Sequence, residues 1–172
     1  LIYSLNLGGA EGQLLQLAHL QTRNRNVTVA YFTGQQDLKE DFEKIGVRVL
    51  KLPPKLNEKI KVLNTFADSG TIIHTHLPHA ELFALIFIRN SKKLITTRHL
   101  AGKYSRRFPE FIGVVLLNFI LFRFKTIIAV SEIVKQDIES KTISRYSKKI
   151  NVIHYGFPFD TVNGDRNISL VK

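Results

Sequence analysis

The strongest constraint on the fold of this chain is a regular alternation of two kinds of segment. Short apolar runs rich in β-branched residues recur along the chain, and the stretches between them carry apolar residues at helical spacing. The runs are "IYSL", "NVTVAYF", "VRVLKL", "TIIHTH", "KLITT", "TIIAV" and "INVIHY". Strands that alternate with helices pair in parallel through right-handed crossovers. The pattern therefore predicts an α/β fold, a doubly wound and mainly parallel Rossmann-like sheet with helices on both faces.

Residue types at the segment ends support this division. Gly46 stands at a C-terminal cap position, Pro78 at the start of a helix and Ser131 at an N-cap. Because 172 residues suit one domain or one lobe of an enzyme, we place a single Rossmann-like domain over residues 1–157. Residues 158–172 lose apolar periodicity and are predicted to be a linker. The chain has no methionine and opens inside an apolar run, so we expect it to be a piece of a longer product.

Positive charge is concentrated in the middle of the chain. The sequence has 25 basic and 14 acidic residues, a net charge of +11. Nine of the basic residues fall between Arg89 and Lys125, a segment in which Glu110 is the one acidic residue. A local positive field attracts phosphate in nucleic acid, an anionic bilayer or a phosphorylated substrate, and a solvated face is the plainer alternative. The absence of cysteine excludes disulfides, thiolate zinc sites and cysteine nucleophiles.

The apolar run "FIGVVLLNFILF", Phe111 to Phe122, is too short to span a bilayer. Twelve residues of helix extend about 18 Å, against a hydrocarbon core of about 30 Å. We predict a helix buried against the sheet. Basic residues also flank the run, as they do in a helix that lies at an anionic membrane surface, so membrane contact is a second prediction. The residues proposed for membrane or phosphate contact are Arg106, Arg107, Arg123 and Lys125.

Three histidines occur within six residues in "HTHLPH", His74 to His79. On a strand, His74 and His76 point to the same face, so both could bind one metal, with His99 recruited from a later strand end. Acidic ligands are scarce at the predicted strand ends. We therefore favour no metal and predict that a strand-end imidazole donates a hydrogen bond to a sugar hydroxyl or a phosphate. A metal-dependent hydrolase that uses this cluster is the alternative.

A glycine-rich loop, Gly8 to Gly12, joins the first apolar run to a helix. Ligands of open α/β sheets bind at the carboxyl ends of strands, where such loops lie. Gly8 and Gly9 let the backbone approach a ligand, and the helix start offers free amides that stabilise a phosphate by typically about 0.3–1 kcal/mol. The loop matches neither Gly-x-Gly-x-x-Gly nor a Walker loop, and a plain strand-to-helix turn is the alternative.

Five segments, taken in order, resemble the N-terminal half of the retaining, GT-B fold glycosyltransferases that use nucleotide sugars, often called family 4. The segments are "LNLGGAEGQLLQLAHL", "IIHTHLPHAELFA", "TTRH", "IIAVSEIVKQDI" and "INVIHYGFPFD". They cover essentially the whole chain. The resemblance implies the acceptor-side lobe of a two-domain enzyme, in which residues 158–172 lead to a C-terminal donor-binding domain outside this chain. Because that domain would hold most of the nucleotide, we predict that this lobe alone is inactive.

The resemblance also implies roles for individual residues. Gly8 and Gly9 would lie against the donor phosphate or the transferred sugar, with Glu11 of the same loop in the substrate-binding set. His76 would line the acceptor side of the cleft. His99 would meet the transferred sugar or a nearby phosphate as the catalytic residue.

Two further positions complete the implied site. Ser131 would cap a helix and border the cleft, and Gly156 would form the turn after the last strand, where the family's usual Asn-Gly is Tyr-Gly here. Retaining members are generally thought to need no protein nucleophile, because the leaving diphosphate helps to deprotonate the acceptor hydroxyl. The implied function is transfer of a hexosyl group from a nucleotide sugar to a glycan or lipid-linked acceptor with retention, as in polysaccharide biosynthesis, and without a cofactor.

The basic stretch suits an acceptor carried on a phosphorylated lipid. We therefore expect a cytoplasmic protein with peripheral contact to the inner face of an anionic membrane. The high net charge also raises the alternative of a nucleic-acid-binding module. Aromatic residues do not interleave with the basic ones at a stacking spacing, and no helix-turn-helix or RNA-recognition pattern occurs, so we expect no nucleic-acid partner.

Overall fold

The computed structural model describes residues 1–90, 93–102, 104 and 109–154, so the predicted linker and Gly156 lie outside the described residues. In chain order the elements are α1 Gly9–Thr22, β1 Thr28–Tyr31, α2 Lys39–Lys44, β2 Arg48–Lys51, α3 Leu56–Asp68, β3 Ile73–His76, α4 Pro78–Phe87, β4 Leu94–Arg98, α5 Glu110–Arg123, β5 Thr126–Ala129, α6 Glu132–Ser140, the 3₁₀ helix η2 Ser144–Lys149 and β6 Ile150–Val152. β1 pairs with β2, and β3 to β6 pair in sequence; every one of these pairs is parallel.

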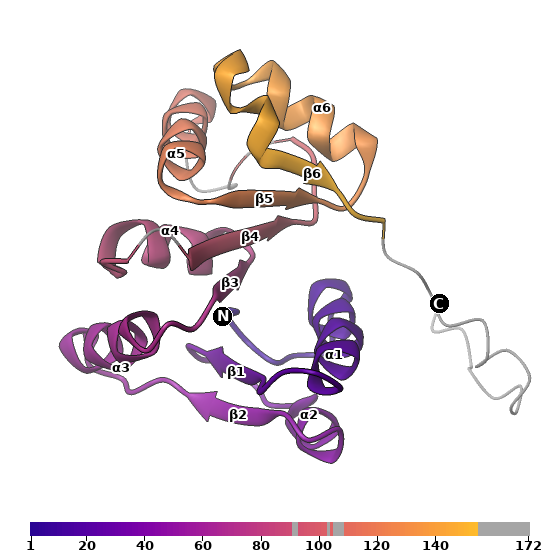
Figure 1. Ribbon diagram of the computed structural model, residues 1–172, viewed down its shortest axis with the longest axis vertical. Helices are drawn as coiled ribbons and strands as arrows, with labels where there is room; N and C mark the ends of the chain where they lie inside the picture. Colours follow the sequence, from indigo (N-terminus) through magenta and orange to yellow (C-terminus); the bar gives the residue numbers. More distant parts are fainter. Residues whose placement is uncertain (91–92, 103, 105–108, 155–172) are drawn as a thin grey trace, which may run out of the picture.

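The first apolar run, residues 2–5, does not form a strand of its own, contrary to the prediction. It makes a parallel bridge from Ile2 to Tyr31, and on its other side the carbonyl of Leu1 accepts a hydrogen bond from the amide of His76 at 2.9 Å. The ladder ends at Tyr3 because its carbonyl accepts from two successive amides of the chain after β1. The segment still lies between β1 and β3 (Figure 1).

This short segment joins the two sheets into one order, β2-β1-segment-β3-β4-β5-β6. Chain order runs outward in one direction through β1 and β2 and in the other through β3 to β6. Such a reversal is the switch point of a doubly wound sheet, outside which ligands bind at the carboxyl ends of the strands. The predicted sheet is therefore confirmed, and its switch point lies between the N-terminal segment and β3.

Helices cover both faces of the sheet. α1 and α2 lie on one face, and α3, α4 and α5 lie on the other (Figure 1). Each face has its own set of buried apolar side chains. Ile2, Leu5 and Phe42 are fully buried under α1 and α2, whereas Leu94 and Ile127 are fully buried in the larger core on the side of α3 to α6. The predicted double-sided packing follows from these two cores.

Three of the predicted helix ends are confirmed. The hydroxyl of Ser131 accepts from the amide of Val134 at 3.3 Å, which caps α6. Gly46 follows α2 with a φ of 80°, a conformation that favours glycine. Pro78 is the first residue of α4. Leu77, just before it, has a φ of 71°, a region that branched and bulky residues rarely adopt, so the turn from β3 into α4 is strained.

The structure divides α5 into a buried and an exposed face, although a helix buried against the sheet was predicted. Its buried residues include Leu117, Ile120 and Leu121. The side chains on its outer face are more than half exposed because a helix on a sheet buries one face. These are Phe111, Val115, Phe119 and Phe122. Within the described residues, none of the helices combines the length and the apolarity needed to cross a membrane.

Candidate functional site

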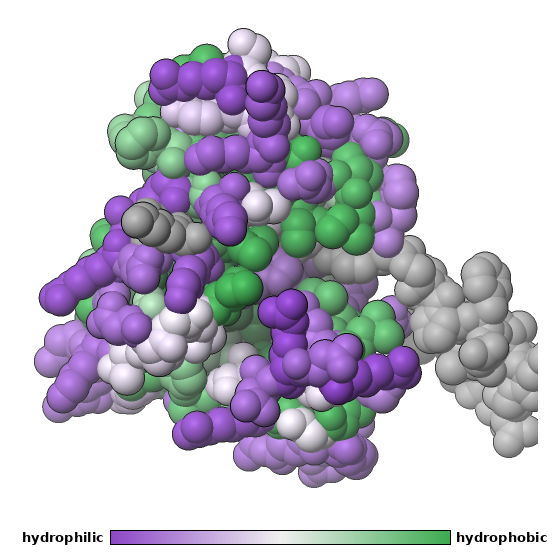
Figure 2. All heavy atoms as spheres, viewed as in Figure 1, coloured by the Kyte–Doolittle hydropathy of each residue, from purple (hydrophilic) through white to green (hydrophobic). Residues whose placement is uncertain are grey.

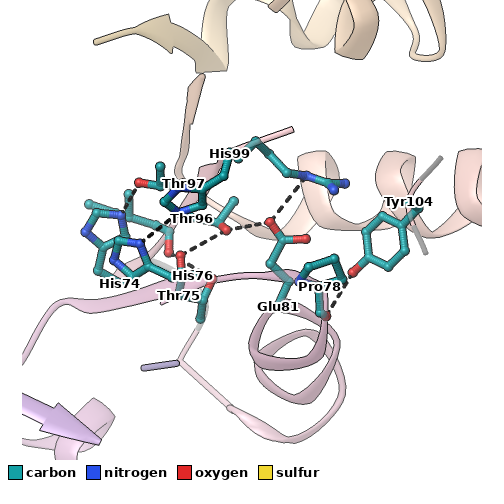
Figure 3. A network of polar contacts seen from close by, with 11 residues as sticks. His74, Thr75, His76, Pro78, Glu81, Thr96, Thr97, His99 and Tyr104 are labelled. Atoms are coloured by element: carbon teal, nitrogen blue, oxygen red, sulfur yellow. Dashed lines mark hydrogen bonds and ion pairs between the residues drawn. The ribbon is translucent and has the colours of Figure 1, made fainter. Parts of the chain in front are cut away.

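The carboxyl ends of β3 and β4 lie side by side at the switch point. Side chains of a strand alternate between the two faces of the sheet, so each strand contributes to two polar clusters. The histidine cluster, on the α1 face, consists of Gln13, His74, His76, Thr97 and His99. The carboxylate cluster, on the α4 face, consists of Thr75, Glu81, Thr96, Arg98 and Tyr104. Figure 3 shows the histidines and threonines of the two strand ends together with Glu81 and Tyr104.

The histidine cluster is a chain of ring contacts. Nδ1 of His76 lies 3.3 Å from Nε2 of His99, and Nδ1 of His99 lies 3.0 Å from Oε1 of Gln13 near the start of α1. The ring of His74 stacks on that of His76 with centroids 4.3 Å apart, and its Nε2 lies 2.7 Å from Oγ1 of Thr97. The predicted shared face of His74 and His76 is confirmed, and the cluster ties both strands to α1.

These contacts determine the tautomers of two neutral rings. Oε1 of Gln13 can only accept, so Nδ1 of His99 carries the proton and donates. Nε2 of His99 is then unprotonated and accepts from Nδ1–H of His76. Nε2 of His76 is left unprotonated, and it is buried without a hydrogen-bond partner among the described residues. The cluster therefore ends in an acceptor that is enclosed within the fold.

Burial keeps the three imidazoles neutral at pH 7. Loss of water around the charged ring lowers the pKa of His74 to about 3 and that of His99 to about 4. Burial, with the charge of His74, lowers the pKa of His76 well below its ordinary value. The cluster thus offers hydrogen bonds without a positive charge, and it suits the hydroxyls of a sugar better than it suits an anion.

The carboxylate cluster is built around a charged pair. Glu81 is fully buried, and its Oε1 accepts from the hydroxyl of Thr96 at 2.6 Å and lies 3.3 Å from Nε of Arg98. A buried carboxylate is tolerated only with such partners. The guanidinium of Arg98 also lies over the ring of Tyr104, 4.5 Å from its centroid. Arg98, the residue before His99, is therefore held between Glu81 and Tyr104.

Tyr104 connects this pair to the strained turn after β3. Burial and the nearby carboxylate of Glu81 raise its pKa, so the hydroxyl stays protonated and donates to the carbonyl of Pro78 at 3.2 Å. Tyr104 also packs against α5, where a Cβ added to Gly113 would lie 2.9 Å from the Tyr104 Cβ. The carboxylate cluster therefore fixes the chain on both sides of the edge that presents His76 and His99.

The glycine loop lies at the start of α1, next to the histidine cluster. Gly8 and Gly9 are exposed, and no side chain caps the first amides of the helix. Glu11 is buried, and its Oε1 accepts from the hydroxyl of Ser4 at 3.3 Å. A Cβ added to Gly8 would lie 2.4 Å from Oε2 of Glu11. The structure thus buries the Glu11 carboxylate beside Gly8, where it supports the loop, and leaves Gly8 and Gly9 exposed.

The remaining predicted residues lie apart from these clusters. Ser131 follows β5 at the same edge of the sheet. Arg123 and Lys125 lie at the opposite edge, where the amide of Lys125 donates to the carbonyl of Leu94 at the start of β4. The Arg123 guanidinium donates to the carbonyl of Ile88, whereas Lys125 is exposed. Arg106, Arg107 and Gly156 lie outside the described residues.

A metal site is not assembled in the part of the chain that the structure describes. No group of three or more His, Asp or Glu side chains there could hold a metal ion. The ring nitrogens of His76 and His99 instead face each other, and Nε2 of His74 faces a threonine hydroxyl. The hydrolase alternative thus has no geometry to support it among these residues.

Sequence reasoning missed Gln13, Glu81, Arg98 and Tyr104. A signal was available for Arg98 and its partner Glu81, since a charged side chain that points inward from a buried strand needs an opposite charge beside it. Gln13 and Tyr104 carry no such signal, because a helix and a loop bring them to the site from distant positions.

Comparison with known proteins agrees with this arrangement. The model of Glycosyltransferase Family 4 matches residues 7–160. No curated protein sequence matches the chain. A crystal structure of Anabaena Alr3699/HepE in complex with UDP and glucose is similar at 16% sequence identity and a TM-score of 0.62, over 92% of this chain and 44% of that one. This chain therefore has the fold of one lobe of a GT-B glycosyltransferase and spans less than half the length of HepE. Because the family model matches most of its residues, the chain belongs to glycosyltransferase family 4.

Proposed function

We propose that this chain is the acceptor-side, N-terminal lobe of a retaining glycosyltransferase that moves a hexosyl group from a nucleotide sugar to a glycan or lipid-linked acceptor. The family match and the lobe's fold support glycosyl transfer. The observation that carries the proposal is the meeting of His76, His99 and the start of α1 at one edge of the sheet. The structure of HepE with UDP and glucose supports a nucleotide sugar as the donor class.

In this proposal the two parts of the site have different tasks. The exposed amides at Gly8 and Gly9 approach the donor phosphate, where the helix start stabilises negative charge that develops as the sugar–phosphate bond breaks. His99, as the catalytic residue, lies against the transferred sugar as a neutral imidazole whose two ring nitrogens are held by Gln13 and His76. His76 lines the acceptor side beneath His99 and orients its ring.

The transfer itself needs no protein nucleophile. The bond from the anomeric carbon to the phosphate oxygen breaks, the acceptor oxygen bonds to the same face of that carbon, and the acceptor proton passes to the leaving diphosphate. The lobe contributes position and hydrogen bonds to this step. Most of the nucleotide contacts would come from a second domain, so the lobe alone is inactive in this proposal.

Donor binding by the full-length protein tests the site. The His99→Ala variant should bind a panel of UDP-, GDP-, ADP- and dTDP-sugars at least tenfold more weakly than the parent, measured by calorimetry. His19→Ala is the matched control, because His19 is exposed in the last turn of α1, and it should bind normally. Equal affinity for the parent and the His99→Ala variant would remove His99 from the site.

A turnover assay tests the division of labour between the lobes. The 172-residue lobe, mixed with each donor and an acceptor mixture, should release no nucleotide and form no glycoside, while the full-length protein does both. Product from the lobe alone would contradict the proposal that it needs a second domain.

We further propose that the enzyme is cytoplasmic and works at the inner face of the membrane on an acceptor carried by a lipid phosphate, in polysaccharide biosynthesis. The basic stretch and the exposed Lys125 support this. The variant Arg106→Gln/Arg107→Gln/Lys125→Gln should sediment less with anionic vesicles than the parent does, most clearly at low salt. Arg123 is left unchanged because it donates to the Ile88 carbonyl. Equal sedimentation of the parent and the variant would contradict the proposal that these basic residues bind the anionic membrane.

A further inference from the structure

The outer face of α5 borders an apolar groove of about 850 Å³. Its other wall is the end of α6, the turn that follows and η2. The apolar side chains that line it are Val114, Val115, Phe119, Phe122, Ile143 and Tyr146. Phe119 is 58% exposed and Phe122 is 69% exposed. Figure 2 shows apolar surface over α5, at the upper left. Apolar side chains that gather on one exposed face in this way indicate a candidate interaction site.

The polar side chains that line the groove are already engaged within the chain. The amide of Asn118 donates to the carbonyls of Val114 and Lys141, and its oxygen accepts from the amide of Ile143. The Thr142 hydroxyl donates to a carbonyl of α6, as does that of Ser140, and Tyr146 accepts from Arg145. A ligand in the groove therefore gains little from hydrogen-bonding groups of its own, which matches a hydrocarbon chain.

Positive charge lies at one side of the groove. η2 contains Arg145, Lys148 and Lys149 and no acidic residue, and none of the three has a carboxylate partner among the described residues. Arg145 lines the groove and Lys148 is exposed. Lys149 donates to three carbonyls at the end of α5, which leaves its charge uncompensated. An apolar groove with cations at its rim complements an anionic amphiphile.

We propose that the groove between α5 and η2 takes an acyl chain of an anionic membrane lipid, with Arg145 and Lys148 facing the headgroup phosphates. The inference rests on the membrane contact proposed above and specifies its geometry: the lobe inserts the outer face of α5, and the exposed Lys125 after the C-terminal end of that helix contributes charge. This surface is the opposite face of α5 from the one packed on the sheet.

The absence of tryptophan from the 172 residues makes the test direct. Phe119→Trp places a single reporter for the lobe in the groove. Leu20→Trp is the matched control, since Leu20 on α1 has the same exposed fraction of 58%. Each variant of the lobe is mixed with vesicles of phosphatidylcholine, with or without phosphatidylglycerol as about a third of the lipid, and with or without brominated acyl chains. The lobe is the molecule whose fold is described here, and circular dichroism with a cooperative melt checks each variant.

Groove insertion predicts that brominated anionic vesicles reduce the tryptophan emission of the Phe119→Trp variant at least twofold and leave that of the Leu20→Trp variant unchanged. Phe119→Asp should lower the vesicle partition coefficient at least tenfold, and Leu20→Asp should leave it unchanged. If the parent lobe binds no vesicles, membrane contact fails altogether. If it binds but the reporter in the groove is not quenched, the groove proposal alone fails. A blue shift of the Phe119→Trp emission that needs only a higher protein concentration would overturn it in favour of a second copy of the chain.

Discussion

The histidine cluster and the carboxylate cluster arise from the same two strands, and the sheet alone separates them. The carboxylate cluster holds an ion pair: Glu81 meets Thr96 and Arg98, and Arg98 meets Tyr104, while Oε2 of Glu81 and Nε of Arg98 have no hydrogen-bond partner among the described residues. The histidine cluster holds no ion pair, and Nε2 of His76 at its end is buried without a hydrogen-bond partner among the described residues. Each cluster therefore keeps buried polar atoms without a hydrogen bond, but one holds an ion pair and the other holds uncharged rings.

This difference in charge determines how much each cluster contributes to stability. A charged pair in a protein interior must be satisfied within the fold, because an uncompensated charge there is costly. A buried neutral imidazole with an unpaired acceptor costs less than an unpaired charge does. The carboxylate cluster therefore holds the strand ends in place, and the histidine cluster is the one that we propose lies beside the substrate.

The largest expected effect on stability comes from removing the carboxylate of Glu81 from the carboxylate cluster. Glu81→Ala leaves Arg98 buried without its carboxylate and removes the acceptor of Thr96, so it should lower the free energy of unfolding by about 3–5 kcal/mol. Urea denaturation at pH 7 measures this. Glu40→Ala, on the exposed first turn of α2, is the control and should change stability by less than about 0.5 kcal/mol. A loss below about 1 kcal/mol for Glu81→Ala would mean that the pair does not hold this edge.

A lower pH should reduce the free energy of unfolding through the histidine cluster. The folded-state pKa values of His74 and His99, about 3 and about 4, lie below the unfolded value near 6.5. Between these values the unfolded state binds more protons, so stability is complete above pH 6.5 and is lost as the pH falls toward 4. From pH 7 to pH 5 the loss should be about 2 kcal/mol for a histidine that stays neutral in the fold, such as His74. Urea denaturation at both pH values tests this, and His74→Gln should flatten the dependence; a parent equally stable at both would refute it.

Substitutions at two glycines compare how tightly the helices pack on the two faces of the sheet. Gly113→Ala brings a methyl group within 2.9 Å of the Tyr104 Cβ, so it should destabilise the carboxylate side by about 1–3 kcal/mol. Gly12→Ala, in α1 beside the histidine cluster, meets open space and should stabilise the lobe by up to about 1 kcal/mol. Thermal melts of the two variants should therefore shift in opposite directions. A shift in the same direction would show that the close approach of Tyr104 to α5 is not tight.

The smallest expected effect is the coupling energy between a substitution in one cluster and a substitution in the other. Thr97→Val removes the partner of His74 and should cost about 1 kcal/mol. Glu81→Gln weakens the ion pair on the other face. Because the two sites share no partner, the double variant should equal the sum of the single ones within about 0.5 kcal/mol. A coupling energy above about 1 kcal/mol would show that the strands transmit strain between the faces.

Particular residues show how far the sequence could be interpreted. The alternation of apolar runs and helical stretches predicted the parallel sheet, and residue type predicted the Ser131 cap and the start of α4 at Pro78. The run at residues 2–5 was wrongly predicted as a strand, because its pairing ends where the Tyr3 carbonyl accepts two amides. The exposed face of α5 was also not predicted, since its composition is apolar on both faces.

The sequence by itself determined the elements, their parallel pairing and the placement of histidines at strand ends, because the periods of strands and helices and the residues that end them are local properties of the chain. The tertiary structure decided which groups meet: that Glu81 neutralises Arg98, that Gln13 orients His99, and that the outer face of α5 stays uncovered. These outcomes depend on burial by segments far apart in the chain, and burial sets both the charge of an imidazole and the cost of a lone carboxylate.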